Sequence, residues 1–127
     1  MGFPNHAADY VENRLSLDDR LIHKPAATYY MKVSETIYRC GIMKDALLVI
    51  DSSLNPCDDS IVVCAYEGEL VLRRLKLISR RCLQDIDHPN FTWPLPVEDD
   101  DTKQVYGVVT YVINDARGGE FDDSPVM

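Results

Sequence analysis

The chain has 127 residues and a formal net charge of −8, which fits one acidic domain. Its hydrophobic fraction of 46% favours a packed globule over disorder. The negative charge disfavours direct nucleic-acid binding through a broad basic face. No stretch approaches the roughly 20 apolar residues that a membrane span needs, and the first residues do not look like a secretion signal. We therefore expect a cytoplasmic protein without membrane contact.

Residues 1–27 are predicted to form an N-terminal arm, because they are polar and only weakly periodic. Ser16 is a candidate N-cap for a short helix over residues 18–22, which Lys24-Pro25 would end. The remainder of the arm is expected to be extended, with little regular structure over residues 2–14.

Residues 28–114 are predicted to hold the fold, because they contain short β-branched, aromatic or apolar runs separated by turn signals. Glu67-Gly68 favours a hairpin turn between two of these runs. The pattern predicts a mainly β domain, built as a compact sandwich or a partly rolled barrel. The expected strands cover residues 28–33, 46–51, 60–66, 69–77, 82–83 and 105–114.

The segment between Asp85 and Lys103 is rich in proline and acidic residues. Phe91 and Trp93 are expected to pack against the core, because large aromatic side chains gain most from burial. The acidic run over residues 98–101 is interpreted as a solvated loop rather than a metal site. Residues 115–127 are expected to form a flexible acidic tail.

The four cysteines and three histidines show no metal-ligand spacing, and no cofactor or metal is expected. A disulfide framework is not expected in an intracellular chain. Cys64 lies within an apolar run and is predicted to be a buried core residue.

Motifs spread along the chain resemble one known family. They are Gly2-Phe3-Pro4, AADYVE at 7–12, LLVIDS at 47–52 and VYGVV at 105–109. Together they are similar to the LexA/UmuD family of self-cleaving serine–lysine peptidases, in particular its processed UmuD-type form. The resemblance reaches about residue 114 and implies the C-terminal β domain of that family for the core. Self-cleavage in UmuD-type members falls just before Gly-Phe-Pro, so this start matches the shortened form, whether nature or cloning set it.

The family's chemistry uses a loop serine as nucleophile and a neutral lysine on a later strand as its base. The resemblance places Thr36 at the serine position, in a loop one residue short, and Arg73 at the lysine position. Arginine stays protonated and cannot serve as a general base. We therefore expect a peptidase homologue without its catalytic pair, not an enzyme. Thr36 or Cys40 acting as a nucleophile in trans remains an alternative.

Arg73 shares strand parity with Val71 and Leu75, so its side chain is expected to be drawn partly inward. A half-buried guanidinium needs compensation, and Glu35 is the expected carboxylate partner.

The resemblance implies an accessory subunit of an error-prone translesion polymerase in the SOS response to DNA damage. The implied partners are a second copy of the chain, a UmuC-like polymerase subunit and the RecA filament. A different reading is a regulatory decoy that pairs with an intact UmuD- or LexA-like chain. The last strand is expected to form the dimer interface, since a long terminal apolar strand that is left unpaired invites pairing. The expected interface residues are Val105, Tyr106, Val108, Val109, Tyr111 and Ile113, and those of the partner-binding arm are Phe3, Pro4, Tyr10 and Val11.

Overall fold

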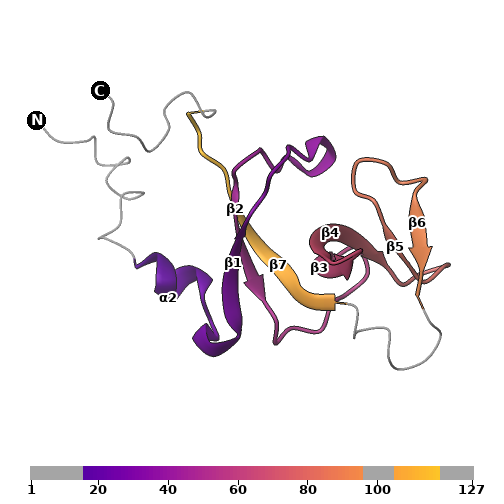
Figure 1. Ribbon diagram of the computed structural model, residues 1–127. Coiled ribbons are helices and arrows are strands. Elements are labelled where there is room, and N and C mark those ends of the chain that lie inside the picture. Colours follow the sequence, from indigo (N-terminus) through magenta and orange to yellow (C-terminus); the bar gives the residue numbers. More distant parts are fainter. Residues whose placement is uncertain (1–15, 96–104, 118–127) are drawn as a thin grey trace, which may run out of the picture.

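The computed structural model describes residues 16–95 and 105–117, and within them seven strands form one antiparallel sheet (Figure 1). The strand order is β1-β2-β7-β3-β4-β5-β6. The predicted mainly β class is confirmed. The strands are β1 Thr28–Lys32, β2 Leu47–Asp51, β3 Ile61–Tyr66, β4 Glu69–Lys76, β5 Cys82–Gln84, β6 Thr92–Pro94 and β7 Val105–Ile113.

The helical segments are short. The α-helix α2 covers Leu17–Leu21, and two 3-10 turns cover Pro25–Ala27 (η1) and Tyr38–Cys40 (η2). Ser16 caps α2 as predicted, since its hydroxyl accepts a hydrogen bond from the Asp19 amide at 3.4 Å. Within the described residues, no helix has the length and apolar character that a membrane crossing needs.

The two faces of the sheet carry separate apolar clusters, and β3 contributes to both. Val63 packs in the first cluster with Leu48, whereas Val62 and Cys64 pack in the second with Leu75. A strand buried on both faces reads as a continuous apolar run, which explains why β3 lacks polar alternation. Cys64 is buried, as predicted.

A glycine sets the close approach of β7 to β2. A Cβ atom on Gly107 would lie 2.6 Å from Ile50 Cγ2 and 3.1 Å from the Tyr29 hydroxyl. Atoms at such distances overlap, so only a residue without a side chain fits between these neighbours.

The sequence did not predict β6, and one of its two aromatic predictions nearby is wrong. Phe91 is 61% exposed and stacks on His88 instead of packing in the core. Trp93 packs against the second cluster, as predicted. Pro94 is tolerated in β6 because this strand lies at the edge of the sheet. The arm residues at 1–15, the acidic run at 98–101 and the tail from 118 lie outside the described residues.

Candidate functional site

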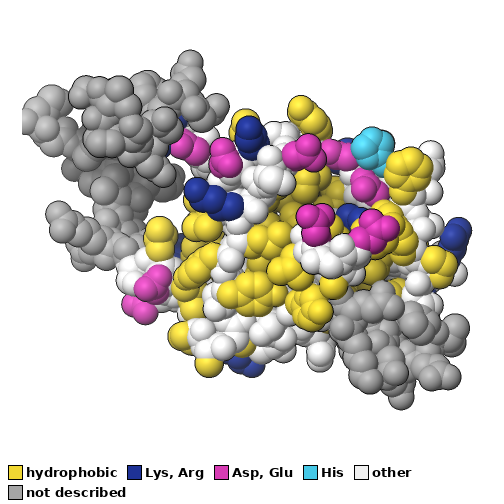
Figure 2. All heavy atoms as spheres, viewed as in Figure 1, with side chains coloured by type: hydrophobic (Ala, Val, Ile, Leu, Met, Phe, Trp, Pro, Cys, Tyr) yellow, Lys and Arg dark blue, Asp and Glu magenta, His cyan; other side chains and the backbone are white. Residues whose placement is uncertain are grey.

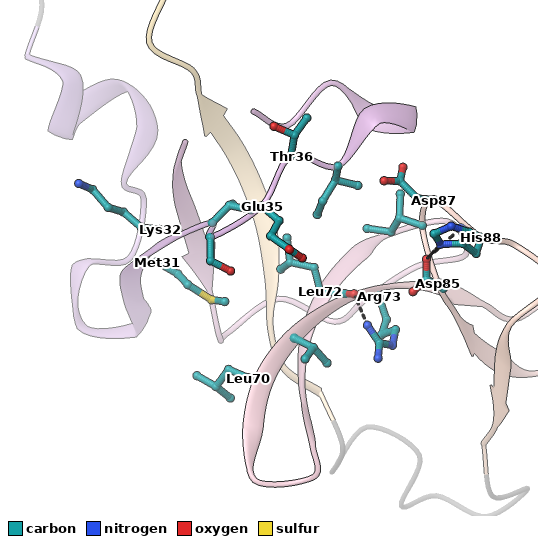
Figure 3. A pocket seen from close by; sticks show the side chains of 15 residues that line it. Met31, Lys32, Glu35, Thr36, Leu70, Leu72, Arg73, Asp85, Asp87 and His88 are labelled. Carbon is teal, nitrogen blue, oxygen red and sulfur yellow. Dashed lines mark hydrogen bonds and ion pairs between the residues drawn. The ribbon is translucent and has the colours of Figure 1, made fainter. Parts of the chain in front are cut away.

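A cleft of about 410 Å³ lies where the resemblance places the family's catalytic residues (Figure 3). Its walls come from three parts of the chain that are distant in sequence: residues 31–37 at the end of β1 and in the loop after it, residues 70–73 of β4, and residues 85–88 between β5 and β6. Both Thr36 and Arg73 line this cleft. The fold therefore brings the two predicted positions to one site.

The Thr36 hydroxyl is occupied by the main chain. Thr36 Oγ1 accepts a hydrogen bond from the Lys44 backbone amide at 3.0 Å. In the described part of the chain, no side-chain amine is hydrogen-bonded to this hydroxyl. Figure 3 shows the Thr36 hydroxyl and the Arg73 guanidinium directed away from one another.

Arg73 lies on aromatic rings instead of pairing with an acid. Its Cζ atom is 4.1 Å from the centre of the Trp93 ring and 5.4 Å from that of Tyr66. Its Nη1 group donates to the carbonyl oxygen of Leu72 at 3.0 Å. The electron-rich ring faces attract the cation and compensate for its partial burial.

The expected pairing of Arg73 with Glu35 is wrong. No ion pair joins these residues within residues 16–95 and 105–117. The predicted inward direction of the Arg73 side chain is confirmed. Val71 and Leu75 pack in the second cluster together with Trp93, and Arg73 points to the same face of the sheet. The aromatic side chains on that face supply the compensation that a carboxylate was expected to supply.

The loop that carries Thr36 is anchored by two side chains from elsewhere in the fold. The Asp87 carboxylate accepts hydrogen bonds from the Arg39 and Tyr38 amides, at 2.9 Å and 3.1 Å. These bonds hold the pKa of Asp87 below its usual value, that from Arg39 contributing most. Asn114, just beyond β7, accepts from the Met43 amide and donates to the Gly41 carbonyl, both at 2.9 Å.

Cys40, the alternative nucleophile, lies in this same loop. Its side chain is partly buried against the first apolar cluster. Burial raises the pKa of the Cys40 thiol above its ordinary value. A raised pKa leaves less of the reactive thiolate at neutral pH.

The expected dimer strand is not an unpaired edge, and that premise is wrong. β7 lies between β2 and β3. Val105 and Val108 pack against the second apolar cluster, and Val109 packs against the first. The exposed large apolar side chains of β7 are Tyr106, Tyr111, Val112 and Ile113.

Half of β7 nevertheless has one open edge. The pairs with β3 involve only residues 105–108 of β7. Residues 110–113 have β2 on one side and, in the part of the chain that the structure describes, no strand on the other.

Among the described residues, no group of three or more His, Cys, Asp or Glu side chains is placed to hold a metal ion.

Sequence reasoning missed the partners that fix these groups. Nothing in the pattern marked Asp87 or Asn114 as anchors of the Thr36 loop, because both act on backbone groups far away in sequence. Tyr66 and Trp93 carried a usable signal, since their aromatic rings are the natural partners of an arginine without an acid.

Comparison with known proteins identifies the family of this chain. The family model described as "Peptidase S24-like" matches residues 1–109. Protein ImpA of Escherichia coli is 36% identical over 118 residues, which cover 91% of this chain and 79% of ImpA. Protein SamA of Salmonella typhimurium is 34% identical over 117 residues, covering 91% and 80% of the two chains. Protein MucA of Escherichia coli is 34% identical over 113 residues, covering 87% and 75%.

The chain therefore belongs to the peptidase S24-like family. Its similarity to ImpA, SamA and MucA places it among the UmuD-like members of the LexA/UmuD group, as the sequence motifs predicted. This similarity supports an accessory role in SOS mutagenesis.

Proposed function

We propose that this chain is a catalytically inactive accessory subunit of an error-prone translesion DNA polymerase. The observation that carries the proposal is the placement of Arg73. The sequence resemblance aligns Arg73 with the family's lysine, and its guanidinium lies 4.1 Å from the centre of the Trp93 ring. A general base must lose its proton to act, and arginine keeps its proton at any ordinary pH.

The environment of Thr36 supports the same conclusion. A hydroxyl becomes a useful nucleophile only when a base removes its proton. Thr36 Oγ1 accepts the Lys44 amide hydrogen, and in the described part of the chain no basic side chain is hydrogen-bonded to this hydroxyl to take its proton. Its side chain acts here as a structural group that holds the loop closed.

The partner-binding role rests on exposed apolar surface and on the open edge of β7. Figure 2 shows hydrophobic side chains gathered over the middle of the visible face of the molecule. Tyr111 and Ile113 are 39% and 40% exposed, and they lie in the half of β7 that β3 does not cover. Unpaired backbone groups on such an edge can pair with the same edge of a second copy. The proposed assembly is a homodimer bound to one UmuC-like polymerase subunit and recruited to RecA filaments.

Affinity capture tests the partner. The tagged chain is mixed with equal amounts of a UmuC-like polymerase subunit and an intact UmuD-type protein, and the bound material is quantified. The proposal expects the polymerase subunit to be retained by a dimer of the chain. Retention of the intact UmuD-type protein without the polymerase subunit would establish the decoy function in its place.

A further inference from the structure

A second polar pocket lies at the β5–β6 end of the sheet, far along the sheet from β1 (Figure 1). Its volume is about 370 Å³, and it shares no lining residue with the cleft that holds Thr36 and Arg73. β4, β5 and β6 supply its floor through Lys76, Gln84 and Thr92. The turn after β4 supplies Arg80, and the loop before β6 supplies Asn90.

The charge of this pocket runs against that of the whole molecule. The chain has 21 acidic and 13 basic residues, yet no Asp or Glu lines the pocket and two cations do. Lys76 and Arg80 come from different elements, so their shared position is a product of the fold. The Asp59 carboxylate binds Lys76 from outside the lining and offsets the charge of that ammonium group, so the net positive charge of the pocket rests on Arg80. A local excess of positive charge in a concave site concentrates anions.

The two cations are held in place by neighbouring groups. Arg80 Nη2 donates to the Thr92 hydroxyl at 3.3 Å, which fixes the guanidinium beside β6. Lys76 Nζ is bound to the Asp59 carboxylate, and this hydrogen bond raises the pKa of Lys76. Lys76 therefore stays charged at neutral pH, and its ammonium group retains further donors for a ligand.

Neutral donors complete the pocket. The Gln84 side-chain amide donates to the Pro89 carbonyl at 3.3 Å, which ties β5 to the loop that carries Asn90. Asn90 lines the pocket, and within residues 16–95 and 105–117 its side-chain amide makes no hydrogen bond. A fork of guanidinium donors, a point charge and an amide suit an anion with several acceptor oxygens better than a carboxylate with two.

We propose that this pocket binds the phosphate group of a small phosphorylated molecule. An extended nucleic-acid strand fits it poorly. The Asp59 carboxylate lies on Lys76, and the Asp58 carboxylate accepts from the Leu77 and Ile78 amides at 2.7 Å and 3.3 Å. These two carboxylates border the pocket on the β3 side and interrupt the row of positive charges that a polyanion would follow.

The probe for this site is inorganic pyrophosphate, titrated into the full chain at constant ionic strength and followed by amide chemical shifts. The expected result is saturable shifts at residues 76–92, with affinity at least about tenfold weaker in Arg80→Gln and in the double variant Lys76→Gln/Arg80→Gln. The matched control Lys32→Gln/Arg39→Gln removes the same charge from exposed positions outside the pocket and is expected to bind as the unmodified chain does.

Arg80→Gln is the safeguard against misfolding, because it leaves the Lys76–Asp59 bond intact. Absence of saturable shifts in the unmodified chain would overturn the proposal. Equal weakening in the control double variant would also overturn it, since only general charge attraction would then be at work. Tighter binding of oligothymidylate than of pyrophosphate, lost in Arg80→Gln, would overturn the assignment to a small molecule.

Discussion

The guanidinium group of Arg73 lies over the indole ring of Trp93, with its Cζ atom 4.1 Å from the ring centre. Trp93 lies in β6 and Arg73 in β4, and β5 runs between these two strands. The contact therefore spans β5 and links the edge of the sheet to β4. Arg73, which the resemblance aligns with the family's catalytic base, therefore makes a structural contact. The proposal that the cleft is inactive depends on this Arg73–Trp93 contact.

This contact should be measurable as a coupling energy. Arg73→Met and Trp93→Leu are each expected to lower the free energy of unfolding, and their interaction in a double-mutant cycle should be about 1 kcal/mol. Urea unfolding measures all three variants. Arg39→Met, an exposed arginine, serves as control and should change stability by less than about 0.5 kcal/mol. A coupling near zero would show that the two side chains do not interact in solution.

The Asp87 anchor should give the stability a specific dependence on pH. The folded-state pKa of Asp87 is depressed by the Arg39 and Tyr38 amides, so its contribution is present above the unfolded pKa of about 3.9 and is lost as pH falls through the lower folded value. Asp87→Ala should therefore destabilise the chain at neutral pH and much less at about pH 3. Asp87→Asn keeps one acceptor and should lie between the two. A stability difference that does not change with pH would contradict this assignment.

Gly107 should tolerate no side chain where β7 runs beside β2. Gly107→Ala places a methyl group 2.6 Å from Ile50 Cγ2, and overpacking of this kind costs about 1–3 kcal/mol. Thermal or urea unfolding measures the loss. The same substitution in an Ile50→Ala background should cost less, because the clashing methyl group is gone. An equal cost in both backgrounds would assign the effect to backbone conformation instead.

The dimer prediction now rests on half of β7. Tyr111→Glu and Ile113→Glu place charge on the exposed end of the strand and should convert a dimer to a chain of 14.4 kDa, as measured by light scattering. Leu70→Glu is the matched control, since Leu70 is 49% exposed but lies in β4. A monomeric mass for the unmodified chain would reject the homodimer.

The strands were predictable because their residues have strong local preferences. The apolar run at 61–66 and the β-branched and aromatic run at 105–113 need no distant information to be read as strands. β6 failed this test because Thr92–Pro94 has only three residues and a proline, so its pairing with β5 decides its structure. The prediction for Phe91 was wrong for a different reason: it lies in the turn before β6, where its amide donates to the His88 carbonyl at 2.9 Å and its ring stacks on His88 at the surface.

The site was predictable in position but not in detail. The motifs were enough to place Thr36 and Arg73 on one cleft, because the order of the strands is a property of the family. The partners of Arg73 were not predicted, since charge alone favoured Glu35 and the choice of Trp93 depends on which face β6 presents to β4. The placement of β7 inside the sheet was also beyond local pattern, because a terminal apolar strand reads the same at an edge or at the centre.

The central claim, that the cleft is inactive, is tested most directly by cleavage in trans. The chain is incubated with an uncleaved UmuD-type protein in the presence of RecA filaments on single-stranded DNA, and the cut product is quantified against an active UmuD-type peptidase. We predict no cleavage above that of the substrate alone, and none after Arg73→Lys, because the Thr36 loop does not present its hydroxyl to that position. Cleavage by the unmodified chain that is abolished by Thr36→Ala, or by Cys40→Ser, would show that the chain is an enzyme.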